Sequence, residues 1–96
     1  MALRARLQEM HVEALVALGE CREAHLDWAD AMQFYRRALD VDMLREAAHR
    51  GIVRCLAQVG RRAEAMAQLR RCGELLRETL GVEPARETTE LLQLLA

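Results

Sequence analysis

The sequence has no lysine, no serine and one proline, and only three of its 96 residues are aromatic. The only threonines are Thr79, Thr88 and Thr89. A catalytic site needs polar groups that converge on one cleft, and no nucleophile is placed beside a base such as His49. We therefore expect that the chain is not an enzyme and binds no cofactor.

The cysteines also lack a pattern. Cys21, Cys55 and Cys72 are odd in number and form no CxxC pair, which argues against a disulfide framework or a zinc knuckle. Cys21 and His25 stand one helical turn apart, but no second pair completes a tetrahedral metal site. No apolar run approaches the ~18 residues of a spanning helix, and no signal peptide is expected. These absences predict a reduced, cytoplasmic setting without membrane or metal.

The charge of the chain is close to balanced. The formal net charge is -1, and all fourteen basic residues are arginine. Such a chain has no field that attracts nucleic acid or an anionic membrane, so we expect no direct nucleic-acid binding. Residues 1–48 hold six arginines against nine acids, and residues 49–96 hold eight arginines against six acids. The two halves can therefore attract each other or a polarised partner.

The residues that are abundant favour helices. Apolar residues at three- and four-residue steps predict amphipathic helices, and no alternating run predicts a strand. We expect one helix over about residues 2–25 and a second, capped by Asp27, over about residues 28–41. A third helix, capped by Asp42, ends at Gly60, and a fourth ends at Gly81. A fifth covers about residues 85–95.

An internal repeat predicts the architecture. Residues 29–32 (ADAM) and 63–66 (AEAM) match at a spacing of 34 residues, which is the tetratricopeptide period. Small side chains at Ala31 and Ala38 allow close helix approach, while Phe34 and Tyr35 fill the gaps. The prediction is an all-α, tetratricopeptide-like α-α superhelix with two helix pairs and a C-terminal helix, forming a single domain over residues 1–96.

Three segments carry a family resemblance: residues 44–50 (LREAAHR), residues 60–65 (GRRAEA) and, most specifically, residues 80–84 (LGVEP). With these motifs, Leu3 to Leu95 resembles the bacterial transcriptional activator domain of SARP-type transcription regulators. In that family Pro84 is commonly followed by Ser-Pro-Glu, and Ala85-Arg86-Glu87 here removes the usual cap of the fifth helix. The family's DNA-binding domain has no counterpart, so we expect a fragment or a stand-alone relative.

The resemblance implies regulation of transcription through protein contacts, often with dimerisation. We expect a protein-protein interaction module whose partner is a second copy, polymerase or another regulator domain. The alternative is a tetratricopeptide sensor or scaffold domain of a signalling ATPase-type regulator that binds an inducer or a partner protein. A winged helix upstream would indicate the first function, and a P-loop domain would indicate the second.

The 34-residue register also predicts a groove, because the first helix of each repeat lines the concave face of such arrays. The groove side chains are Glu13, Val16, Glu20 and Glu23 in the first repeat, and Ala47, Arg50, Arg54 and Gln58 in the second. Two interpretations stay open. The groove can bind a peptide or helix of mixed polarity, or its charges can be solvated and pair with each other, at ~0 to 1 kcal/mol for each exposed pair.

Two other features bear on partners. Trp28 is either an interface hot spot or a packing residue between repeats. The two ends of the array have apolar stripes that predict self-association, as a homodimer, unless the last helix folds back on the second repeat. These stripes consist of Leu3, Leu7 and Met10 at one end, and Leu91, Leu92, Leu94 and Leu95 at the other.

Overall fold

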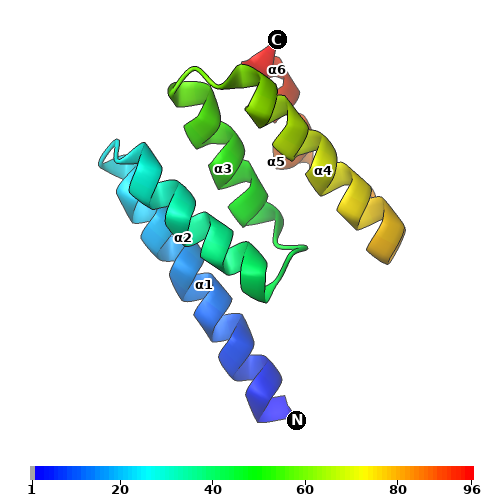
Figure 1. The fold of residues 1–96 in the computed structure, drawn as a ribbon. Coiled ribbons are helices and arrows are strands. Elements are labelled where there is room, and N and C mark those ends of the chain that lie inside the picture. Colours follow the sequence, from blue (N-terminus) through cyan, green and yellow to red (C-terminus); the bar gives the residue numbers. More distant parts are fainter. Residues whose placement is uncertain (1) are drawn as a thin grey trace.

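The computed structural model describes residues 2–96, which contain helices and no strand. The helices are α1 (Ala2–Ala24), α2 (Trp28–Val41), α3 (Glu46–Gln58), α4 (Arg62–Leu80), α5 (Arg86–Thr89) and α6 (Leu91–Leu95). Figure 1 shows two antiparallel pairs, α1 with α2 and α3 with α4, which stack side by side. α2 begins at Trp28 and α4 at Arg62, 34 residues later. The predicted all-helical, tetratricopeptide-like fold is confirmed.

Local signals in the sequence set most helix ends. The Asp27 carboxylate caps α2 by accepting a hydrogen bond from the backbone N–H of Asp30, as predicted. Gly60, just after α3, and Gly81, the C-cap of α4, both have the left-handed backbone (φ +80° and +65°) that glycine adopts without strain. These two positions therefore turn the chain at the predicted places.

The cap predicted at Asp42 is wrong. The N-cap of α3 is Arg45, and the Asp42 carboxylate instead accepts a hydrogen bond from the Leu44 N–H inside the α2–α3 turn. The third helix begins three residues later than such a cap would require, because this aspartate stabilises the turn that precedes it. The predicted fifth helix is interrupted at Glu90, which separates α5 from α6.

Tyr35 lies at the centre of the core and has no exposed surface. Its ring is held between Gly19 of α1 and Gly51 of α3, where a Cβ atom would approach ring carbons to 2.6 Å and 2.3 Å, respectively. Both distances are shorter than any ordinary carbon contact, so the ring fits only because these two positions have no side chain. Four alanines at the other helix contacts also have no exposed surface: Ala31, Ala38, Ala48 and Ala65. Ala31 and Ala38 were predicted to lie at such contacts.

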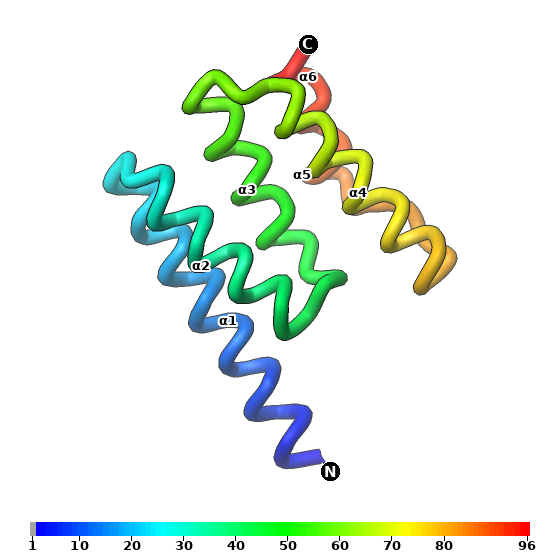
Figure 2. The backbone as a smooth tube through the Cα atoms, viewed as in Figure 1, coloured from blue at the N-terminus to red at the C-terminus, as the bar shows by residue number. Residues whose placement is uncertain are grey.

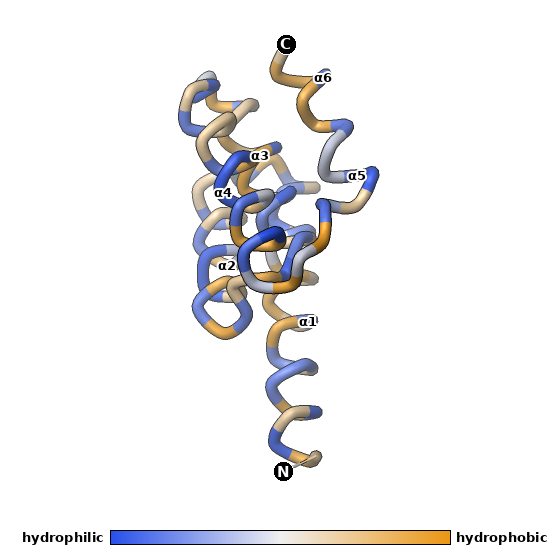
Figure 3. The backbone as a smooth tube through the Cα atoms, turned by 90° about the vertical axis from the view of Figure 1, so that its right-hand side faces the viewer, coloured by the Kyte–Doolittle hydropathy of each residue, from blue (hydrophilic) through white to orange (hydrophobic). Residues whose placement is uncertain are grey.

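The C-terminal segment does not continue the array as a third helix pair. After α4 the chain turns back, and Figure 2 shows it returning alongside α4 toward the α3–α4 turn. In Figure 3, α5 and α6 form a layer of their own, on the side opposite α2. Leu95 reaches the hydrophobic core with 3% of its surface exposed, and the segment contacts α3 and α4. Residues 84–95 thus cover part of the second repeat.

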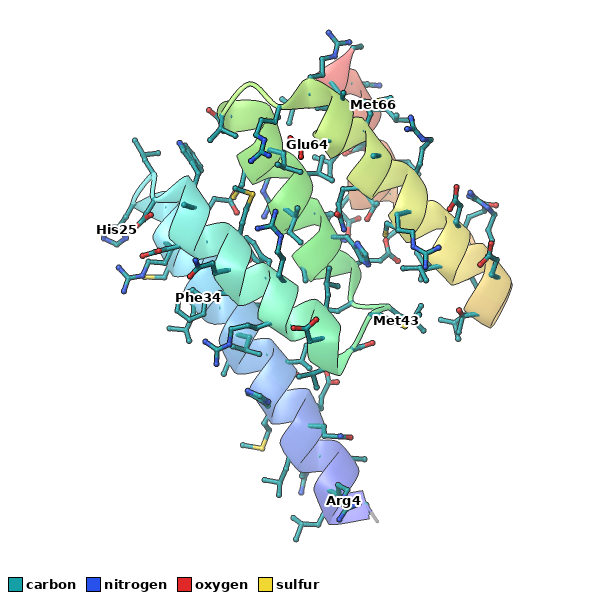
Figure 4. All side chains as sticks on the ribbon, in the orientation of Figure 1. Arg4, His25, Phe34, Met43, Glu64 and Met66 are labelled. Carbon is teal, nitrogen blue, oxygen red and sulfur yellow. The ribbon has the colours of Figure 1, made fainter. Side chains whose placement is uncertain are left out.

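His49 is a polar residue buried in this core. Its Nε2 donates to the carbonyl oxygen of Met43 at 2.9 Å, at the α2–α3 turn (Figure 4), and its Nδ1 accepts from the Gln68 amide at 2.8 Å. Burial lowers the pKa of His49 below 6.5, although the Met43 carbonyl and the charges of Glu46 and Asp42 act in the opposite direction. The imidazole is therefore neutral in the folded protein near pH 7.

This depressed pKa predicts a loss of stability in mild acid. The unfolded chain takes up the proton first, so the stabilisation is present above pH 6.5 and is lost as pH falls toward the folded-state pKa. The free energy of unfolding should fall by at most about 1.4 kcal/mol per pH unit in that window. Urea titrations from pH 7 to 5 measure it. His49→Gln should flatten this slope, and an unchanged slope in the variant would assign it to other groups.

Candidate functional site

Three side chains from three helices form a polar network between α1 and α3. The Arg54 guanidinium holds the Glu23 carboxylate in two hydrogen bonds, from Nε at 2.7 Å and from Nη2 at 3.1 Å. The Tyr35 hydroxyl donates to the same carboxylate at 2.6 Å. Bidentate arginine–carboxylate pairs are among the stronger polar contacts in proteins. This network fixes the first helices of the two repeats relative to each other.

The network sets the charge of its members. Burial alone would raise the pKa of the Glu23 carboxyl, but the hydrogen bonds from Arg54 and Tyr35 lower it below its ordinary value. Burial and the neighbouring Glu23 carboxylate raise the pKa of the Tyr35 hydroxyl well above its ordinary value. Glu23 is therefore ionised and Tyr35 neutral at physiological pH. The pair of opposite charges leaves this part of the site electrically neutral.

A second ion pair joins the same helices at the far end, where Arg45 binds Glu9 of α1. Of the acidic side chains on α1, Glu9, which was not predicted to line the groove, and Glu23, which was, are thus each neutralised by an arginine. Glu13 and Glu20 lie between these pairs, are exposed, and make no ion pair among residues 2–96. The charge that remains unpaired on this part of α1 is therefore negative.

An open cleft lies where α1, α3 and α6 meet the start of α2. It has a volume of roughly 530 Å³. Its lining combines an aromatic ring, two aliphatic side chains, a neutralised ion pair and two exposed polar groups: Glu20, Glu23, Ala24, Trp28, Arg54, Gln58 and Leu94. Trp28 is half-buried, because one part of the ring packs on the core and another part faces the cleft.

The structure brings together four of the predicted groove residues. Glu20, Glu23, Arg54 and Gln58 line the cleft. Glu13 is exposed on α1 outside it. Both interpretations of the groove therefore apply in part, because Glu23 and Arg54 pair with each other while Glu20 and Gln58 stay open to solvent.

Val16 and Arg50 have other roles than the predicted one. Val16 has only 9% of its surface exposed and belongs to the hydrophobic core, because it lies on the same side of α1 as the buried residues Val12 and Leu15. The Arg50 Nη1 donates to the Thr88 hydroxyl at 3.1 Å, so the C-terminal segment already occupies it. The groove of the second repeat is thus partly filled by the chain itself.

The four C-terminal leucines separate into two groups. Leu95 is buried and Leu91 is half-buried against the core, so neither presents a free apolar surface. Leu92 and Leu94 remain exposed, at 50% and 57% of their surface. Leu94 lies at the cleft, whereas Leu92 faces the space between α4 and the C-terminal segment. The apolar surface at this end is therefore smaller than the sequence predicts.

Sequence reasoning missed the residues that hold the C-terminal segment in place. The Glu46 carboxylate accepts hydrogen bonds from the Ala85 N–H at 2.8 Å and from the Thr88 hydroxyl at 2.6 Å. Thr88 has no exposed surface. The sequence offers no signal for these contacts, because the burial of Thr88 appears only in the structure, where a buried hydroxyl rarely lacks a polar partner. These contacts place Leu94 at the cleft.

Thiol and metal chemistry have little support in the described residues. Burial raises the pKa of the Cys55 and Cys72 thiols to about 11, so both remain protonated. Cys21 is exposed, and the His25 Nδ1 lies 2.8 Å from its carbonyl oxygen. No group of three His, Cys, Asp or Glu side chains within residues 2–96 is arranged to hold a metal ion. None of the described helices is long and apolar enough to cross a membrane.

Residues 1–95 match the family model of the bacterial transcriptional activator domain. The chain belongs to this family. No curated protein and no solved structure matches it. The resemblance inferred from the 80–84 motif is confirmed, and the chain is a regulatory domain of the kind found in transcriptional activators.

Proposed function

We propose that this bacterial transcriptional activator domain acts as a protein-protein interaction module in the cytoplasm, with the cleft between α1, α3 and α6 as its binding site. The observation that carries the proposal is the cleft itself, which is lined by the half-buried Trp28 and by Leu94, whose side chain is 57% exposed. Tryptophan contributes disproportionately to binding when it becomes desolvated. A segment of a partner protein that inserts an apolar side chain here would bury both residues.

The charges at the cleft favour a basic partner segment. Glu20 at the cleft is exposed without an ion pair among residues 2–96, as is Glu13, which lies outside the cleft farther along α1, while the Glu23–Arg54 pair is internally neutral. A ligand with an arginine or lysine beside its apolar anchor would complement these carboxylates. The same negative surface would repel phosphates, which supports the proposal that the isolated chain does not bind duplex DNA.

Tryptophan fluorescence reports binding at the cleft directly, because Trp28 is the only tryptophan in the chain. Peptides selected from a random library on the immobilised chain should combine a large apolar residue with adjacent basic residues. Titration of such a peptide should shift the Trp28 emission to shorter wavelength as the ring leaves water. Rising salt should weaken the binding, since Glu20 and Glu13 are exposed.

Variants of the cleft provide the control. Leu94→Gln and Glu20→Gln should each reduce the affinity by about tenfold, the effect of one lost anchor or charge contact. Gln33→Ala, an exposed substitution on α2 that does not touch the cleft, should leave it unchanged. Peptides that bind without changing the Trp28 emission and tolerate both cleft substitutions would refute this site.

A further inference from the structure

The outer face of α1 has an apolar stripe along its whole length. Its members recur at steps of four and three residues, and every one is exposed: Leu3, Leu7, Met10, Ala14, Ala17 and Cys21. We call this stripe the seam. The buried residues of α1 lie on the other side of the helix: Val12, Leu15, Val16 and Gly19. The seam therefore has no role in the core of a single chain.

The large residues of the seam are confined to its first half. Leu3, Leu7 and Met10 have 69%, 56% and 57% of their surface exposed, which is unusual for side chains of this size. The start of α1 projects beyond α2, and Figure 4 shows Arg4 at this projecting end. Met10 lies farther along α1, between Glu9 and Val12, which border Val41 at the end of α2. Ala14, Ala17 and Cys21, all small, make up the second half of the seam.

We propose that α1 binds the α1 helix of a second copy of this chain, antiparallel and seam to seam. Steps of four and three residues are the pattern by which two helices interlock over several turns. In the antiparallel register Leu3 faces Cys21 of the other copy, Leu7 faces Ala17, and Met10 faces Ala14. Each layer joins a large side chain to a small one, which is how facing positions fill space without voids.

The opposite orientation fits less well. A parallel pair would place each seam residue against its own copy, so that Ala14 and Ala17 meet alanines while Leu3 and Leu7 meet leucines. The alanine layers would leave gaps and the leucine layers would hold the helices apart there. Only the antiparallel register keeps the distance between the two α1 helices the same along the whole contact. It also repeats each layer twice through a two-fold axis, as closed dimers require.

The charges beside the seam agree with this register. Arg6, Glu13 and Glu20 each precede a seam residue, so they lie along one flank of it. In antiparallel helix pairs this flank meets the same flank of the partner, which places Arg6 opposite Glu20 of the other copy, twice per dimer. At the centre the two Glu13 carboxylates approach each other, so this one contact opposes association.

This surface is distinct from the cleft, although Glu20 borders both, and it requires no ligand. The test is the mass of the intact 96-residue chain by sedimentation equilibrium from roughly 1 to 500 µM, a range that covers weak dimers. We expect a reversible monomer–dimer equilibrium that Leu7→Glu weakens by at least about tenfold. Leu92→Glu, an equally exposed leucine at the other end of the chain, should leave it unchanged.

A charge exchange tests the register. Arg6→Glu should weaken the dimer, Glu20→Arg should weaken it similarly, and the double variant should restore it, because the ion pair is re-formed with reversed signs. Glu13→Gln should strengthen it. A monomer at 500 µM, larger assemblies, or a dimer that Leu92→Glu disrupts while Leu7→Glu does not would each overturn the proposal. Circular dichroism of every variant verifies that the helices remain folded.

Cysteine cross-linking tests the orientation. In the antiparallel dimer the two Cys21 residues lie about 27 Å apart along the helices, far beyond disulfide reach. Mild oxidation should therefore leave the wild-type chain uncrosslinked and should link the Leu3→Cys variant into a covalent dimer. Adding Cys21→Ser to that variant should abolish the link. A wild-type dimer held by Cys21 itself would show a parallel contact and refute the arrangement.

Discussion

Replacing Gly51 by alanine is expected to destabilise the protein by about 2 kcal/mol, although alanine is the better helix former. The new methyl group would lie 2.3 Å from the Cε2 and Cζ atoms of Tyr35. The ring cannot move away, because its opposite edge lies against Gly19, where a Cβ would come within 2.6 Å of Cε1. The strain must therefore be relieved by separating α1 from α3, and urea denaturation measures the loss.

Gly73 provides the matched control, because it also lies buried within a helix. The three atoms nearest to a Cβ there all belong to the Arg77 guanidinium, at 3.1 Å or more, and this group is the far end of a flexible side chain. Gly73→Ala should change the free energy of unfolding by at most about 1 kcal/mol, and in the stabilising direction if Arg77 moves aside. Equal effects of the two substitutions would show that the Tyr35 ring is not confined as described.

The comparison of Gly51 with Gly73 shows where the sequence stops being informative. The 34-residue match at residues 29–32 and 63–66 predicts the helix pairs, because that period reflects which residues must face each neighbouring helix. Neither glycine lies in those matched motifs. Only the three-dimensional packing shows that one of them admits an aromatic ring and the other does not.

The site shows the same division between local and long-range signals. The register places Glu23 on α1 and Arg54 on α3 correctly, because both follow from helix periodicity. It also assigns Val16 to the groove, although a valine at that position is buried by the neighbouring helices. The C-terminal segment was the least predictable part, since its position depends on contacts between residues 38 to 42 positions apart, such as Arg50 with Thr88 and Glu46 with Thr88.

Because of these contacts, we expect a second large loss of stability when Thr88 is replaced. Thr88→Val keeps the shape of the side chain and removes the hydroxyl that joins Glu46 and Arg50. Both charged groups then lose a partner in a half-buried site, which should cost about 2 kcal/mol. Because residues 84–95 are a short terminal segment, the loss should appear as local opening of that segment. Hydrogen exchange of the amides of residues 85–95 measures it.

Thr89→Val is the matched control for this prediction. Thr89 is the neighbouring residue of the same type, is exposed, and donates only to the Arg86 carbonyl within its own helix turn. Its substitution should leave exchange of the C-terminal amides nearly unchanged. If both variants open the segment equally, helix propensity and not the Glu46 contacts holds it in place.

Opening of residues 84–95 should also weaken peptide binding in the cleft. Leu94 lies at the cleft only while α5 and α6 are held on α3, so Thr88→Val should weaken peptide binding without altering any residue that lines it. The apparent affinity should fall in proportion to the fraction of molecules in which exchange shows the segment closed, because only the closed segment completes the binding site. Binding that is insensitive to Thr88→Val, in a variant whose segment is shown to open, would mean that Leu94 does not contribute to recognition.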